Sequence, residues 1–378
     1  MYNYIPLEQA ADILDSYRKP VNSKERLNLI KGKPLDELFP YYGATGQVGW
    51  IDSFLTDGEY ILLGEDGAPF LNPYAEKAYI VHGKTWVNNH AHILHSKTNN
   101  EFLCYYLNYF NYKKYVSGTT RLKLTQAQMR KIPIPNIPSD EQSRIVAHIK
   151  ELFSELDKAV DTLKTTKEQL EVYRQVVLKD EFSRVSKYAP LGNVATSRLG
   201  KMLDKQKNTG TPKKYLRNIN VRWFSFDLAD LQEMKIEETE FEKYTIKKDD
   251  LVICEGGEPG RCAVWEKNET IYFQKALHRV RFTVESEPRL YMYYIWFMTN
   301  TGALNKFYTG TGIKHLTGQS LEKVLVPVID IKIQQKLLAS IELRLSVCDS
   351  VEKIVDTALA QAGAMRQNIL KQAFEGKI

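Results

Sequence analysis

The stretches GTTRLKLTQAQMRKIPIP (118–135) and GTGIKHLTGQSLEKVLVP (310–327) decide the fold, because they are two copies of one segment. They align without a gap, with residue 118 falling on residue 310, an offset of 192. The residues Gly, Thr, Leu, Thr, Lys and Pro are identical at positions 118, 119, 124, 125, 131 and 135. An internal repeat of this length indicates that one architectural plan occurs twice in the chain.

The repeat continues on both sides of this segment. Downstream at the same offset, Gln142 falls on Gln334, and the pattern RQ, LK and F of 174–182 returns in 366–374. Upstream, DGEYILLGEDG (57–67) pairs with KKDDLVICEGG (247–257), and PLEQAAD (6–12) with PLGNVAT (190–196). The sequence therefore predicts globular domains at 1–138 and 185–330, followed by helical segments at 139–184 and 331–378.

Each globular domain is predicted to have an α+β fold. Short apolar runs bounded by Gly, Pro and Asn predict strands. These runs are ILLGEDG, KAYIVHG and HAHILHS in the first domain, and DLVICEGG, TIYFQ and RVRFTV in the second. An aromatic helix is expected after the strands in each, at 102–110 and 289–298.

The first helical segment has the apolar spacing of a coiled coil. Ser139 and Gln142 fit a capping box after three prolines, at positions 133, 135 and 138. The stripe that follows advances in steps of three and four: Ile149, Leu152, Leu156, Ala159, Leu163, Thr166, Leu170, Tyr173 and Val177.

The second helical segment repeats the stripe with smaller residues in its later half. It reads Ile341, Leu345, Cys348, Val351, Val355, Ala358, Ala362, Met365 and Ile369. Because small side chains opposite bulky ones let helices approach closely, the two segments are expected to form an antiparallel coiled coil with a pseudo-two-fold relation. The alternative is that each helix packs only on its own domain.

Bulk properties set wider limits on the protein. The net charge of +6 and pI of 8.8 suit a polyanionic partner, although an ordinary solvated surface has the same signature. The first residues do not form a signal peptide, and no apolar run is long enough for a membrane span, so we expect a cytoplasmic protein. The four cysteines lack metal-binding spacing and are expected to be buried or free thiols.

Two similar domains on a helical spacer fit a ligand that offers two sites at a fixed distance, as duplex DNA does. A helix of about 42 residues, Glu141 to Phe182, would span roughly 60 Å. That length can seat two modules over half-sites about 34–36 Å apart. Because the two domains differ in sequence, the two half-sites are expected to differ too.

The segments that differ most between the domains are the candidate DNA-reading surfaces. They are KPVNSKERLNLIKGK (19–33) and PYYGATGQVGW (40–50) in the first domain, and 197–224 in the second. Arg and Lys suit phosphates and guanine edges, and Asn and Gln suit adenine. The alternative for these segments is an ordinary solvated, lysine-rich loop. The Gly/Thr loops before each helix could equally be turns. We expect DNA contacts from Lys24, Arg26, Lys31, Lys33, Tyr41, Tyr42, Thr45, Thr119, Arg121, Lys123, Arg198, Lys201, Lys205, Lys213, Lys214, Arg217, Asn218, Arg222, Thr311, Lys314 and His315.

The whole pattern resembles the specificity subunits of type I restriction–modification systems. The resemblance is carried by the duplicated GTT/GTG, LT and K-I/V-x-[IV]-P run, by Gln142 and Gln334, and by the RQ, LK and F endings. The strand segments YILLGEDG and DLVICEGG, together with YYGATGQVGWID, are similar to the target-recognition domains of that family. The resemblance covers nearly the whole chain, although the lysine-rich stretch 19–33 aligns poorly.

This resemblance implies two target-recognition domains separated by two helices that form an antiparallel coiled coil. It implies a bipartite, asymmetric site on double-stranded DNA, with one half read by each domain. The helices would dock two methyltransferase subunits, and the larger complex adds restriction subunits. S-adenosylmethionine, ATP and Mg²⁺ would then be bound by the partners and not by this chain.

No catalytic or metal site is predicted in this chain. LNPYAEK (71–77) and HGKT (82–85) each lack residues of the methyltransferase and phosphate-loop motifs that they approach. Four histidines gather at 82, 90, 92 and 95, yet no acidic or cysteine ligand has matching spacing. Two rival functions remain open: a coiled-coil scaffold that does not bind DNA, and the recognition half of a split restriction–methylation enzyme.

Overall fold

The computed structural model describes residues 3–204 and 208–377, so the predicted contact Lys205 lies outside the described residues. The chain forms two compact units. Unit 1 comprises Met1–Thr165 and Val355–Ile378, and unit 2 comprises Thr166–Ile354. Each unit therefore contains one globular domain and part of both long helices, which differs from a division into four consecutive segments.

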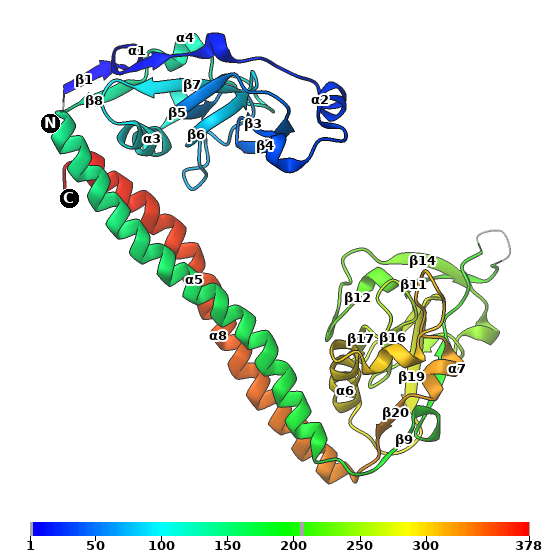
Figure 1. Cartoon of the computed structure of the whole chain (residues 1–378). Helices are drawn as coiled ribbons and strands as arrows, with labels where there is room; N and C mark the ends of the chain where they lie inside the picture. The colour runs from blue at the N-terminus through cyan, green and yellow to red at the C-terminus, as the bar shows by residue number, and fades with distance from the viewer. Residues whose placement is uncertain (1–2, 205–207, 378) are drawn as a thin grey trace. The chain divides into compact units, whose positions relative to one another are not determined.

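The domain of unit 1 is built on a six-stranded sheet with the order β2-β7-β5-β6-β3-β4 (Figure 1). All neighbours in this sheet are antiparallel except β3 and β6. A separate pair, β1 and β8, joins the start of the chain to the strand before the first long helix. The elements are β1 (Asn3–Pro6), α1 (Leu7–Ala10), β2 (Ala11–Ile13), α2 (Ser23–Ile30), β3 (Phe39–Gly43), β4 (Gly46–Ile51), β5 (Thr56–Gly64), β6 (Ala78–Val87), β7 (Ala91–Ser96), α3 (Asn100–Tyr109), α4 (Gln126–Met129) and β8 (Pro133–Asn136).

The domain of unit 2 repeats half of this sheet and replaces the other half. The order β10-β19-β16-β17 matches β2-β7-β5-β6, and β9 pairs with β20 as β1 pairs with β8. The remaining strands form a second sheet, β14-β11-β18-β15, and the hairpin β12-β13. The elements are β9 (Tyr188–Pro190), β10 (Ala195–Leu199), β11 (Thr211–Leu216), β12 (Val221–Arg222), β13 (Ser225–Phe226), β14 (Gln232–Ile236), β15 (Thr245–Ile246), β16 (Leu251–Cys254), β17 (Cys262–Val264), β18 (Ile271–Phe273), β19 (Leu277–Phe282), α6 (Pro288–Asn300), α7 (Gly318–Glu322) and β20 (Leu325–Pro327).

The predicted α+β class, the strands and both aromatic helices are thus confirmed. Each aromatic helix covers the core because its apolar positions recur at helical spacing, as with Phe102, Leu103, Tyr106 and Leu107 in α3. The four cysteines are free and buried, as predicted. Among the described residues, no helix has the length and apolar content needed to cross a membrane.

The two long helices are α5 (Ser139–Ser183) and α8 (Ile331–Phe374) (Figure 1). In unit 1, the early residue Ile149 of α5 shares a core with the late residue Phe374 of α8, and Arg366 forms an ion pair with Asp157. In unit 2, the late residue Arg174 of α5 lies 2.8 Å from Asp349, in the first half of α8. The helices therefore run antiparallel within each unit, and they also pack on the globular domains.

The predicted seam agrees with the burial of the helices except at three positions. Tyr173 is 46% exposed, Met365 is 55% exposed and Ala159 is exposed too, so these three predictions are wrong. In unit 2 the neighbouring Arg174 takes the inward position, and its charge is neutralised there by carboxylates of both helices. Ile149, Leu156, Val177, Ile341, Leu345, Cys348, Val355 and Ala362 are buried, and Leu152, Leu163, Leu170, Val351, Ala358 and Ile369 are half-buried.

The predicted capping box at Ser139 and Gln142 is also wrong. Gln142 is buried, donates to the Ile137 carbonyl at 3.0 Å and accepts from Thr98. Gln334 makes the equivalent bond to the Ile329 carbonyl at 2.9 Å. Both glutamines anchor the start of a long helix to the domain that precedes it.

Candidate nucleic-acid interface

The Gly/Thr loop before each long helix is a closed hairpin, and the two hairpins have the same hydrogen bonds. Ser117 and Lys123 exchange backbone hydrogen bonds of 3.0 and 2.8 Å, as Thr309 and His315 do at 2.8 and 2.9 Å. Gly118 and Gly310 have φ values of +102° and +95°, a region that favours glycine. The repeat therefore preserves an ordered turn that presents side chains at its tip.

Each hairpin is fixed to its sheet at the leucine that follows it. The Leu124 N–H donates to the Glu65 carbonyl at 2.7 Å, and the Leu316 N–H donates to the Glu255 carbonyl at 2.7 Å. The Leu124 carbonyl lies 2.9 Å from His92 Nε2, and the Leu316 carbonyl lies 2.9 Å from His278 Nε2. The matching turns at Glu65 and Glu255 thus have a structural role, because each holds its hairpin through a backbone carbonyl.

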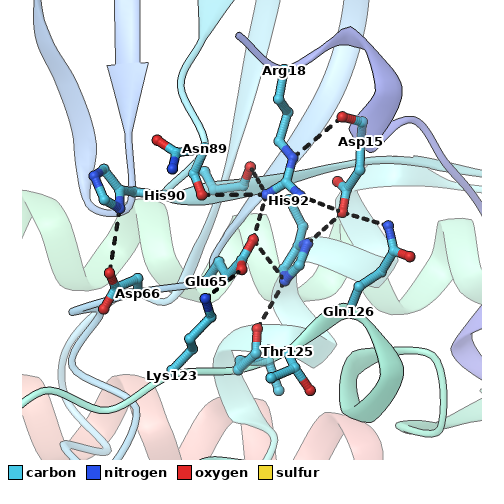
Figure 2. Close-up of polar contacts among 12 residues, drawn as sticks. Asp15, Arg18, Glu65, Asp66, Asn89, His90, His92, Lys123, Thr125 and Gln126 are labelled. Carbon is cyan, nitrogen blue, oxygen red and sulfur yellow. Dashed lines mark hydrogen bonds and ion pairs between the residues drawn. The ribbon is translucent and has the colours of Figure 1, made fainter. Parts of the chain in front are cut away.

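Around the first hairpin, charged groups of several elements form one network (Figure 2). Glu65 accepts from Arg18 at 2.5 Å and lies 3.3 Å from the Lys123 ammonium. Next to it, Asp66 pairs with Arg121 at 2.7 Å. The network joins the end of β5, the hairpin and the segment after β2 into one surface.

A groove of about 660 Å³ opens beside this network in unit 1. It is lined by α2, the β3–β4 hairpin and the turn Asn88–His90. Arg26 lies 4.9 Å over the Tyr41 ring and donates to the Trp50 carbonyl at 3.4 Å. The groove therefore brings the predicted segments 19–33 and 40–50 together with amide and imidazole side chains that can bind base edges.

The second hairpin lies among different side chains. Asn218 donates to the Gly256 carbonyl and accepts from Arg261 at 2.8 Å. Arg217 pairs with Asp230 at 2.7 Å, and the Trp223 indole donates to Glu258 at 2.9 Å. Side chains of 217–223 thus lie near the second hairpin, since Asn218 bonds Gly256 and Gly256 lies beside His315, whereas segments 19–33 and 40–50 line the groove of the first domain.

Most predicted contact residues are accessible, and several are already paired. Lys33 pairs with Asp52 at 2.8 Å, and Arg222 lies 3.6 Å from Asp227. Tyr42, Lys213, Arg217, Asn218 and Arg26 are half-buried, and the exposed ones are Lys24, Lys31, Lys33, Thr45, Thr119, Arg121, Lys123, Arg198, Lys214, Arg222, Thr311, Lys314 and His315. A phosphate would compete for these cations with the carboxylates that now pair with them.

Two of the predicted DNA contacts are side chains that point inward, so these two predictions are wrong. Tyr41 is only 4% exposed, because its ring packs beside Ile51 and Trp86 and its hydroxyl bonds the backbone of Val21. Lys201 forms an ion pair with Glu240, and only 12% of its side chain is exposed. Neither side chain reaches the surface as a free donor.

Sequence reasoning missed the side chains that position the hairpins. From the sequence, His92 was one of four clustered histidines for which hydrogen-bonded packing or DNA contact was preferred over metal binding, but its partners Asp15 and Gln126 and the neighbouring Arg18 were not considered. The available signal was the repeat itself, because His92 and His278 occupy matching strands β7 and β19. Within 3–204 and 208–377, no group of three or more His, Cys, Asp and Glu side chains is arranged to hold a metal ion.

Comparison with known proteins places this geometry in context. The profile of the type I restriction modification DNA specificity domain matches residues 9–172 and again residues 190–342. A putative type I restriction enzyme specificity subunit of Haemophilus influenzae is 28% identical over 371 residues, covering 94% of this chain and 91% of that protein. The EcoKI specificity subunit of Escherichia coli K12 is 22% identical, covering 69% of this chain and 61% of its own length.

Solved structures share the fold. A chain from a study of complex assembly and conformational transition in the type I R-M system superposes with a TM-score of 0.73 at 14% identity, covering 100% of this chain and 98% of that one. The HsdS subunit from Thermoanaerobacter tengcongensis gives a TM-score of 0.57 at 14% identity, covering 100% and 97%. Both likenesses concern the fold alone.

Proposed function

The chain belongs to the family of type I restriction–modification DNA specificity proteins, and from this premise we propose that its two domains read the two unlike halves of a bipartite DNA site. In this proposal the chain supplies recognition and carries out no chemistry on the DNA. The long helices join the two readers and receive the partner subunits that do.

The observation that carries this proposal is that the two domains share one hairpin and one four-stranded sheet but differ in the side chains around the hairpin. Both domains hold the same hairpin with the same backbone bonds, at the same place on the same four-stranded framework. Around it, unit 1 presents Arg26, Asn89 and His90 in a groove, whereas unit 2 presents Arg217 and Asn218. Contacts to phosphates fix the position of a protein on DNA, and contacts to base edges give sequence specificity. Two domains with the same hairpin and sheet but different surrounding side chains therefore suit two half-sites of different sequence.

The helix pair of unit 2 supports the docking of a partner. Its exposed apolar residues include Val172, Tyr173 and Val176 on α5, and Leu343, Val347 and Ile354 on α8, each between 46% and 69% exposed. With about 100° between successive residues, they point away from Leu178 and Leu338, which pack inward. We define these six residues as the outer apolar face.

The outer apolar face has no counterpart in unit 1. At the offset of 192, its positions hold Glu151, Glu155, Thr162, Ala364, Met365 and Asn368. An exposed apolar patch on one helix pair favours a helical partner with an apolar stripe. We assign it to a methyltransferase subunit, with a second copy bound through the more polar face of unit 1 and restriction subunits joining through these two.

The remaining parts of the proposal follow from the partners. S-adenosylmethionine, ATP and Mg²⁺ would be bound by the methyltransferase and restriction subunits. The assembly would act on DNA in the cytoplasm.

Methylation sequencing of DNA modified by the chain together with its methyltransferase tests recognition. We expect one bipartite asymmetric sequence, and binding by the complex should weaken steeply with salt as counterions are released. Binding without sequence preference, or no binding, would favour the scaffold alternative and contradict the proposal.

Val347→Glu tests docking, because a charge within the outer apolar face would oppose burial by the partner. We expect the affinity for the methyltransferase to fall at least about tenfold while the fold is unchanged. The matched control is Glu155→Gln, at the equivalent position of unit 1. It should leave unaltered the binding of the methyltransferase copy that docks on the outer apolar face of unit 2. Equal behaviour of the two variants would argue against this surface.

A further inference from the structure

A second pocket of unit 1 shares no lining residue with the groove beside the first hairpin. It has a volume of about 710 Å³ and lies between the β5–β6 connection, the turn after α3 and the last turns of α8. From the β5–β6 connection it is lined by Leu71, Pro73 and Lys77, among others. These three belong to the segment LNPYAEK (71–77), to which the proposed function gives no role.

This segment makes the first domain differ from the second. Residues 65–77 join β5 to β6, whereas residues 255–261 join the matching strands β16 and β17. Lys77 and Arg261 end the two connections, and their carbonyls accept equivalent hydrogen bonds, from the last N–H of β5 at 2.9 Å and from the last N–H of β16 at 2.8 Å. Lys77 and Arg261 therefore occupy one structural position in the two copies.

The two cations differ in their counter-charge. Arg261 pairs with Glu258 at 2.7 Å. Lys77 is 1% exposed, and its ammonium donates to the backbone carbonyls of Pro73 at 3.3 Å and Asn108 at 3.5 Å. No carboxylate among the described residues forms an ion pair with it. Burial lowers the pKa of Lys77 to about 8, as expected for an ammonium that lacks a counter-charge.

Two further ammonium groups line the same pocket. Lys113, in the turn after α3, and Lys371, near the end of α8, are both exposed. Lys371 lies 3.9 Å from Glu375, which also pairs with Lys377 at 2.6 Å. No Asp or Glu of the described chain is among the lining residues. Because a buried charge without a counter-charge is unfavourable, a pocket that gathers three lysines in this way suits an anion.

The rest of the lining indicates which anion fits. The side chains of Asn111 and Asn368 add amide donors, and Asn111 Oδ1 already accepts from a backbone N–H at 3.1 Å. Beside them, Tyr109 and Phe110 are half-buried and Leu71 is 55% exposed, which gives the pocket an apolar wall. A phosphate monoester has close to two negative charges and three acceptor oxygens, which match several cations and amides. The apolar wall suits an organic group attached to that phosphate.

We propose that this pocket binds a small organic phosphate, with Lys77 at its inner wall, Lys113 and Lys371 around the phosphate, and Tyr109 and Phe110 against the organic group. This site goes beyond DNA recognition and does not depend on it. Since the lining comes from the first domain and from α8, the ligand would join the two. Binding should therefore stabilise unit 1.

Calorimetric titration of the full chain without DNA tests the ligand class, with adenosine 5′-monophosphate as the probe. We expect one site per chain with a dissociation constant of about 1 mM or lower. Inorganic phosphate should bind at least about tenfold more weakly, because it lacks the organic group, and adenosine should not bind measurably. No saturable binding of the monophosphate, or equal binding of adenosine, would overturn the proposal.

Substitutions place the binding in this pocket. Lys77→Met should weaken binding of the monophosphate at least about tenfold and leave the urea midpoint of unfolding unchanged or higher, because it removes a buried charge. Lys113→Met, at an exposed position, should weaken binding without affecting folding. The matched control is Lys114→Met, at the next residue, which does not line the pocket.

The outcomes of these substitutions bear on the pocket alone. Wild-type affinity in Lys77→Met, or an equal loss in Lys113→Met and Lys114→Met, would refute the site, since binding in the DNA-reading groove would survive all three changes. The monophosphate should also raise the urea midpoint of the wild type and not that of Lys77→Met. Because no measurement involves DNA, failure here would leave the proposed recognition of DNA standing.

Discussion

Single residues decide whether each hairpin can form. A Cβ added at Gly118 would lie 2.4 Å from the Arg121 carbonyl oxygen, and one added at Gly310 would lie 2.4 Å from the Ile313 carbonyl oxygen. Both neighbours are backbone atoms of the same tight turn, so neither can move without opening it. The identity of these glycines in the repeat therefore has a steric cause.

We expect Gly118→Ala to destabilise unit 1 by about 1–3 kcal/mol and to weaken protection of the first half-site only. Gly310→Ala should do the same for unit 2 and the second half-site. Gly312→Ala is the control, because nothing lies within 4 Å of a Cβ there. Urea unfolding and footprinting measure the two effects, and a Gly312→Ala variant as damaged as the other two would disprove the steric explanation.

The lowered pKa of His278 predicts the direction of a pH effect on stability. Its pKa in the folded chain lies below the ordinary 6.5, so the unfolded state binds a proton more readily. The contribution of His278 is therefore fully present above the unfolded pKa and is lost as pH falls below it. Unfolding of wild type and His278→Gln across mildly acidic pH should show a steeper loss in the wild type, and parallel curves would contradict this.

At the level of elements, the repeat was enough to predict the fold class, the strands, the aromatic helices and the antiparallel helix pair. It failed where a side chain's role depends on a partner distant in sequence. Gln142 looked like a capping residue, but it bonds Thr98 and the Ile137 carbonyl. His92 looked like a stray histidine because Asp15 lies 77 residues away. Tyr41 looked like a DNA contact because its burial depends on β6.

Arg174 shows how polar contacts set the register of the helices in unit 2. It is 7% exposed and contacts Glu171, Asp349 and Glu352 at 2.7 to 2.8 Å. We expect Arg174→Ala to lower the free energy of unfolding by about 3 kcal/mol, because the three carboxylates would lose the cation that neutralises them. The control Arg222→Ala, whose ion pair with Asp227 is exposed on both sides, should cost at most about 1 kcal/mol. Equal losses in thermal or urea unfolding would argue against a register role for Arg174.

For the whole molecule, each unit is completed by a helix end that comes from the other copy of the repeat. Phe374 of α8 packs on Phe102, Tyr106 and Tyr109 of α3, and Phe182 of α5 packs on Tyr294 and Phe297 of α6. The phenylalanine that ends each copy of the repeat therefore packs on the aromatic helix of the domain in the same unit.

Phe374→Ala should destabilise unit 1 by about 3–5 kcal/mol, the usual cost of emptying a buried phenylalanine site. Hydrogen exchange should show the loss in α3 and in the first half of α5, with α6 unchanged. Phe182→Ala should give the reciprocal pattern in unit 2. If either variant loosened both domains equally, the units would not be separately closed.

The packing of Phe374 also has a consequence for how the protein is made. The ribosome adds 265 residues between Tyr109 and Phe374, which takes roughly 13 to 50 s at 5–20 residues per second. Throughout that interval the aromatic surface of α3 lacks its cover, although the last strand of the first domain, β8, is complete once residue 136 has been added. The domain that is synthesised first is thus completed last. Truncation just before Phe374 would therefore destabilise the first domain.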